Sequence, residues 1–168
     1  RPVTCRTELG HAVASFAARA CRKLRTQGSR AGAVHVFLTT NRFRAEEPQY
    51  ANALTVGLDV PSSDTRHITA AASAALTRIY KPAFRYHKAG IMLLDIVAAK
   101  SEQRHLFLPT DHTLSDRLMA TVDRLNARMG ADTVFLAAAG VANGWSMRAE
   151  HRSPRYTTQW SELVRAAA

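Results

Sequence analysis

Apolar residues recur every three or four positions near the start of the chain, and further along they alternate with polar ones. In the stretch 7–27 they follow one helical face, at Val13, Phe16, Ala17, Ala20 and Leu24. Gly28 ends this predicted helix. Alternation over 32–40 predicts a strand with two distinct faces. A polar connection leads to a second alternating run, 54–58, which ends at Pro61.

A second helix and a further strand follow. Ser63 or Asp64 can cap a helix that Pro82 stops, with an apolar stripe at Ile68, Ala72, Ala75, Leu76 and Ile79. The continuous apolar run within 88–98 predicts a buried central strand. If residues 1–4 are the end of a first strand, the order is β-α-β-β-α-β. This α+β fold is a four-stranded antiparallel sheet with both helices on one face, which leaves the other face open for binding.

The remainder of the chain predicts a linker and a small module. Residues 100–114 are mostly polar, and a helix starting at Ser115 carries a stripe of Leu118, Val122, Leu125 and Met129. Two short strands are expected at 133–137 and 145–149. We therefore expect a domain at 1–99, a linker at 100–114 and a small α+β module at 115–168, too short to be stable without support.

Charge is distributed unevenly over these parts. Residues 1–100 carry 15 Lys/Arg against 6 Asp/Glu, whereas residues 101–168 carry 8 against 7. A basic excess of this size is typical of a polyanion-binding domain, and a solvated basic surface is the alternative. The chain lacks an apolar run of roughly 20 residues and a signal peptide, so we expect no membrane partner. Two cysteines fit a reducing cytoplasm. Because the chain begins with Arg1, we expect a fragment or a processed product.

Groups for catalysis are scarce in the sequence. Seven histidines are scattered without metal-site spacing, and Asp95 is the only carboxylate in its strand. A single carboxylate cannot hold two metal ions or divide acid and base roles. We therefore expect no catalytic residue, metal or cofactor in this chain.

Binding groups gather at two strand ends instead. The first cluster follows the 32–40 strand, and its candidate residues are Thr39, Thr40, Asn41, Arg42 and Arg44. The second cluster, with candidates Arg85 and Lys88, precedes the 88–98 strand. Hydroxyl and amide side chains allow close approach to phosphates, and arginines add charge-assisted contacts. Both clusters can contact one duplex backbone, although the sequence by itself slightly favours the alternative of a polar turn and a solvated loop.

Several ordered motifs resemble the C-terminal region of UmuC-like Y-family translesion DNA polymerases. They are Thr39-Thr40-Asn41-Arg42-Phe43, Arg85-Tyr86-His87-Lys88-Ala89-Gly90 and Ser153-Pro154-Arg155-Tyr156-Thr157-Thr158. The resemblance implies a little-finger domain, which holds primer–template duplex DNA through phosphates, followed by a UmuC-type C-terminal module. It also implies a bacterial cytoplasmic protein of the SOS response. Catalytic carboxylates and Mg²⁺ would belong to a palm domain upstream, so the parent protein would be a DNA polymerase.

A linker motif suggests a further partner. Residues 103–107 resemble the peptide with which these polymerases bind the β sliding clamp, with Gln103, Leu106 and Phe107 as the matching positions. An extended peptide can insert Leu and Phe into an apolar pocket, and packing on the neighbouring domain is the alternative. The family resemblance also implies contacts to a UmuD-type subunit and RecA.

Two other functions remain open at this point. The order β-α-β-β-α-β is shared by RNA-binding sheet domains, which stack bases on two or three aromatic side chains. Residues 89–97 contain no aromatic residue, which argues against this function. A protein-interaction adaptor with an incidental basic surface is the other alternative, and a DNA titration distinguishes it.

Overall fold

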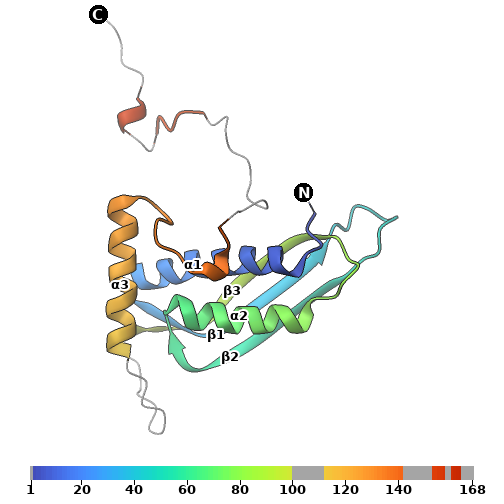
Figure 1. Ribbon diagram of the computed structural model, residues 1–168, viewed down its shortest axis with the longest axis horizontal. Helices are drawn as coiled ribbons and strands as arrows, with labels where there is room; N and C mark the ends of the chain where they lie inside the picture. The colour runs from blue at the N-terminus through green and yellow to red at the C-terminus, as the bar shows by residue number, and fades with distance from the viewer. Residues whose placement is uncertain (1, 100–111, 142–152, 158–159, 164–168) are drawn as a thin grey trace, which may run out of the picture.

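The computed structural model describes residues 2–99, 112–141, 153–157 and 160–163. The elements follow in the order α1 (Arg6–Thr26), β1 (Ser29–Thr40), β2 (Ala51–Ser62), α2 (Thr65–Ile79), β3 (Tyr86–Ala98) and α3 (His112–Met129). Two short 3₁₀ helices, η2 (Ala137–Ala139) and η3 (Trp160–Glu162), come last. The α+β class is confirmed, with α1 and α2 side by side on one face of an antiparallel sheet (Figure 1).

The sheet has three strands in the order β2-β1-β3, so the predicted four-stranded sheet is wrong in its strand number. The expected first strand is reduced to one bridge, in which Val3 and Tyr86 exchange both backbone hydrogen bonds at 2.9 Å. A single bridged residue is too short to count as a strand. The bridge places Val3 beside the start of β3.

The central strand is β1, and the prediction that 88–98 is central was also wrong. Val34, Val36 and Leu38 of β1 have no exposed surface, whereas Met92 and Ile96 of β3 are about half exposed. The apolar run of β3 misled the prediction because both of its faces carry apolar residues. Only one of those faces packs on the core, through Ala89, Ile91 and Leu93.

The core lies between the sheet and the two helices. Apolar positions of α1 and α2 meet the inward side chains of β1 there, and the fully buried ones are Val13, Ala17, Cys21, Ile68, Ala72 and Ala75. Asp64 is the N-cap of α2, as expected for one of the two candidates, and its side chain accepts a hydrogen bond from the Arg66 backbone at 2.7 Å. The pattern of apolar residues therefore located both helices correctly.

The helix α3 crosses the end of α1 (Figure 1). Arg25 of α1 forms two hydrogen bonds of 2.7 Å with the carboxylate of Asp123, and Arg30 of β1 pairs with Asp116 at 2.7 Å. The strand expected at 133–137 is absent, because 133–134 form a bend, 135–136 have no regular structure and Ala137 begins η2. The strand expected at 145–149 lies outside the described residues.

Candidate nucleic-acid interface

The face of the sheet opposite the helices is made of outward side chains in matched rows. Strand register places Thr39 between Ala51 and Lys88, and places Phe37 between Ala53 and Gly90. The next row aligns His35 with Thr55 and Met92, and the His35 Nδ1 lies 2.9 Å from the Thr55 Oγ1. This open face is thus formed largely by small or neutral residues, with its basic group at one end.

Phe37 lies flat on this face because its neighbour has no side chain. A Cβ on Gly90 would be 2.4 Å from the Cζ of Phe37, so the aromatic ring occupies the space above the glycine. The Phe37 ring and the Gly90 backbone beneath it therefore pack closely on the open face. Phe37 is the one Phe, Tyr or Trp on the open face among the described residues, which does not match the two or three stacking aromatics of an RNA-binding sheet.

Both predicted basic clusters come together at one end of the sheet. The antiparallel register sets Thr39 opposite Lys88, so the end of β1 meets the start of β3. Glu47 of the β1–β2 loop connects them further, since its Oε1 accepts from Arg44 Nη1 at 2.8 Å and from Arg85 Nη1 at 2.9 Å. The sequence analysis predicted the two clusters but missed the shared carboxylate, which nothing in its local pattern indicates.

Two of the predicted candidates use their polar side-chain atoms in hydrogen bonds at the start of the β1–β2 loop. The hydroxyl of Thr40 donates to Gln49 Oε1 at 2.8 Å and accepts from the Tyr50 backbone at 3.0 Å, and Thr40 is almost fully buried. The Oδ1 of Asn41 accepts from the Phe43 backbone at 3.1 Å and closes a turn. Both residues therefore shape the loop through these hydrogen bonds.

The shape of the β1–β2 loop depends on Gln49. Its Nε2 lies within hydrogen-bonding distance of three backbone carbonyls, those of Asn41 at 3.1 Å, Arg44 at 2.8 Å and Glu47 at 3.0 Å. The Gln49 side chain thereby holds three points of the loop backbone close together. A glutamine in a polar connection carries no sequence signal for this role, so the sequence analysis missed it.

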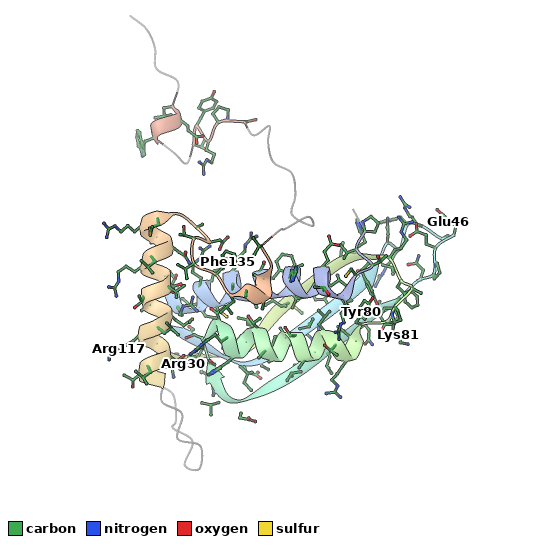
Figure 2. The ribbon with its side chains drawn as sticks, in the orientation of Figure 1. Arg30, Glu46, Tyr80, Lys81, Arg117 and Phe135 are labelled. Carbon is green, nitrogen blue, oxygen red and sulfur yellow. The ribbon has the colours of Figure 1, made fainter. Side chains whose placement is uncertain are left out.

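The base of the loop is anchored on α2 by Tyr50. Its hydroxyl donates to the Ile79 carbonyl at 2.6 Å, and its ring lies 4.8 Å from that of Phe84. The ammonium of Lys81 sits 5.2 Å from the Tyr50 ring centroid, a distance suited to a cation–π contact. Tyr80 and Lys81 lie beneath the loop near Glu46 in Figure 2, at the opposite end of the molecule from α3.

The cations at this end differ in their availability. Arg44 and Arg85 are half exposed and share Glu47, whereas Arg42 and Lys88 are exposed and have no ion-pair partner among the described residues. Arg42 borders a surface hollow, whose other lining residues are Thr39, Thr40, Gln49, Tyr50 and Ala51. A phosphate approaching this hollow would meet a guanidinium, a threonine hydroxyl and no carboxylate among the lining residues.

Gln103, Leu106 and Phe107, the expected clamp-binding residues, lie outside the described residues. Among the residues that are described, no three His, Cys, Asp or Glu side chains gather as metal ligands would. Within the same ranges, the helices are too short or too polar to cross a bilayer.

Comparison with known proteins identifies the family. Residues 1–106 match the impB/mucB/samB family C-terminal domain, and residues 116–166 match a domain of unknown function, DUF4113. The chain belongs to the impB/mucB/samB family. This membership confirms the resemblance to the C-terminal region of UmuC-like Y-family polymerases.

Relatives align with nearly the whole chain. Protein UmuC of Salmonella typhimurium (strain LT2) is 39% identical over 164 residues, which cover 97% of this chain and 39% of the relative. Protein MucB of Salmonella typhimurium is 40% identical over 158 residues, covering 94% and 37%. Protein ImpB of the same species is 36% identical over 162 residues, covering 96% and 38%. The chain thus spans about two fifths of the length of the curated relatives it matches.

Proposed function

We propose that residues 1–99 of this impB/mucB/samB family chain hold primer–template duplex DNA without reading its sequence. The observation that carries the proposal is the β1–β3 register, which sets Thr39 beside Lys88 at the end where Arg42, Arg44 and Arg85 also lie. Cations on a pre-shaped loop next to an open sheet suit a row of phosphates. The open face has few side chains that could hydrogen-bond to the edges of bases, so the contacts would not depend on the DNA sequence.

The wider role follows from the family. We propose that the chain belongs to a translesion DNA polymerase of the bacterial SOS response, in which an upstream palm with Mg²⁺ performs the chemistry. This chain would then be non-catalytic and would act in the cytoplasm. Holding DNA through its backbone would let a damaged base pass, because phosphates are the same on damaged and undamaged strands.

DNA binding can be tested by fluorescence anisotropy with a primer–template duplex at several salt concentrations. Arg42→Ala and Lys88→Ala should each weaken binding several-fold and reduce the slope of log affinity against log salt by about 1, which is the loss of one phosphate contact. Lys23→Ala is the matched control, because Lys23 is exposed on α1 and faces away from the open sheet.

The result should be the same for two duplexes of unrelated sequence. Binding that depends on sequence, or a loss as large for Lys23→Ala as for the loop variants, would overturn the proposal. A chain that does not bind duplex at low salt would favour the protein-interaction alternative.

The second part of the proposal is attachment to the β sliding clamp through residues 103–107. Leu106→Ala with Phe107→Ala should abolish binding to purified clamp in surface plasmon resonance, because both apolar anchors are removed. Gln103→Ala should weaken binding, and Leu108→Ala, outside the motif, should not. Unchanged affinity in the double variant would contradict the clamp proposal and leave DNA binding unaffected. A UmuD-type subunit and RecA are further proposed partners.

A further inference from the structure

The helix α3 has three faces with different chemistry. Its inner face carries Asp116, Met119 and Asp123, and Met119 is almost fully buried there. Asp123 pairs with Arg25 and Asp116 with Arg30, so both acidic side chains of the helix are used on this face. These contacts fix which sides of α3 point away from the sheet domain.

Next to the inner face lies an exposed apolar stripe. Leu114, Leu118, Leu125 and Met129 are separated by four, seven and four positions, which places them on one side of a helix. They are 65%, 44%, 38% and 65% exposed. Leu114 and Met129, near the two ends of the helix, are the most exposed of the four. Exposed apolar surface of this kind on a helix is typical of an interaction site.

The stripe continues into a groove beside α1. Val122, one turn from Leu118 and Leu125, lines this groove together with Val134 and Phe135, and Ala18 forms part of its wall on α1. Val134 is 38% exposed and Phe135 is 43% exposed. Figure 2 shows Phe135 above α1, on the segment that returns from the end of α3. An apolar side chain from a partner helix has a place to enter here.

Arginines border this apolar surface on both sides. Arg117, Arg124 and Arg128 form a ridge on α3 beside the stripe, and no ion pair is recorded for them among the described residues. Arg117 points away from α1 and α2 in Figure 2. On the other side, Arg19 and Arg22 of α1 border the groove. The groove lining also includes Asp132 and Asp123, and the second of these is paired with Arg25. Arginines outnumber these carboxylates, so the surface is an apolar strip with a basic excess on both sides.

We infer that this surface of α3 binds an amphipathic helix of a partner protein, with apolar residues along one side and carboxylates flanking them. Leu114, Leu118, Leu125 and the groove would receive the apolar residues, and the bordering arginines would pair with the carboxylates. Residues 116–166 match the domain DUF4113, and this binding would be a function for that domain. The surface lies at the opposite end of the molecule from the Glu46 loop, so DNA and this partner can be held together (Figure 2).

Charge argues against other occupants. A second copy of the chain would set the ridge of Arg117, Arg124 and Arg128 near another set of arginines. Residues 142–168 carry Arg148, Arg152, Arg155 and Arg165 against two glutamates, so this segment is also basic. Duplex DNA would satisfy the arginines but leave the leucine stripe in water. An acidic amphipathic helix meets both requirements.

The test uses residues 1–168 and two fluorescein-labelled synthetic helices, one with a Leu/Glu heptad pattern and one with Leu/Lys in its place. We expect the acidic peptide to bind and the basic peptide not to bind. Leu118→Ala with Leu125→Ala, and separately Arg117→Glu with Arg124→Glu, should each weaken acidic-peptide binding at least tenfold. Lys23→Glu with Arg78→Glu is the control of equal charge change, and should retain most of the affinity.

Circular dichroism of each variant establishes that it is folded, and primer–template binding provides a second readout. The leucine variant should bind DNA like the unchanged chain. The proposal is overturned if the acidic peptide does not bind, if both peptides bind equally, or if the leucine variant retains full affinity. It is also overturned if sedimentation shows a dimer that Leu118→Ala with Leu125→Ala dissolves, because a second copy would then be the occupant.

Discussion

The covered face of the sheet and the attachment of α3 are held by different kinds of contact. Val34, Val36 and Leu38 pack on two helices with no exposed surface, through apolar contacts that have little direction. The α3 attachment instead relies on Arg25, which donates to both oxygens of Asp123, to the Ser63 carbonyl at 2.8 Å and to Thr65 Oγ1 at 3.0 Å. The first set of contacts determines that the domain folds, and the second determines where one helix points.

The largest effect should come from the covered face. Leu38→Ala removes a fully buried side chain from β1 and leaves a cavity, so the free energy of unfolding should fall by ~2–5 kcal/mol. Urea unfolding followed by circular dichroism measures it. Phe43→Ala is the control, because Phe43 is 97% exposed and its removal should cost less than about 0.5 kcal/mol. Equal losses in the two variants would contradict the assignment of the core.

Breaking the α3 attachment should have a smaller and more local effect. Arg25→Ala leaves Asp123 without its partner and removes two further hydrogen bonds, those to the Ser63 carbonyl and Thr65 Oγ1, which should lower stability by ~1–3 kcal/mol. Hydrogen exchange should accelerate in α3 much more than in β1, since the sheet keeps its own core. Lys23→Ala, on the exposed side of the same helix, should change neither. Equal acceleration in β1 would show that the two regions unfold as one unit.

The same attachment should depend on pH through Asp64. Burial raises the pKa of this carboxyl, but hydrogen bonds from Arg66 and Ser115 outweigh it and lower the pKa to about 2. The ionised form therefore stabilises the fold above the ordinary pKa of 3.8, and this stabilisation is lost as the pH falls towards 2. Melting temperature between about pH 6 and pH 3 should fall more steeply in the unchanged chain than in Asp64→Asn. Parallel curves would contradict this role.

The smallest effect on stability should come from the loop, where it is accompanied by a gain in binding. Glu47→Gln releases half-exposed Arg44 and Arg85, and exposed ion pairs contribute only ~0–1 kcal/mol. Two freed arginines should strengthen duplex binding several-fold in the anisotropy titration. Glu46→Gln removes the same charge from the neighbouring position, which has no recorded ion pair, and should strengthen binding less. Equal gains would mean that only net charge matters.

The parts of the fold that the sequence predicted correctly are those held by apolar contacts. Apolar spacing located α1 and α2, and alternation located β1, because these patterns record burial against a core. The same alternation could have shown that Thr40 points inward, since it shares the face of Val36 and Leu38. The position of β3 at an edge could not be deduced, because Met92 and Leu94 make its open side apolar as well.

The candidate site was predictable in part for the same reason. Runs of basic residues revealed the two clusters at the strand ends, and strand register then set Lys88 beside Thr39. Contacts of Glu47 and Gln49 depend on how a ten-residue loop closes, which no local pattern encodes. The three faces of α3 became separable only when the partners of Asp116 and Asp123 were known.

The Gln49 amide has a consequence for the thermodynamics of binding. A loop free to move would lose conformational entropy when it settles on a ligand, and that loss would weaken the complex. Gln49 removes much of that freedom in advance, by holding three carbonyls around one neutral group. Dissolved salt does not screen such neutral contacts as it screens ion pairs. The loop that presents Arg42 should therefore keep its shape at any salt concentration. Salt should change only the affinity of the loop for phosphates.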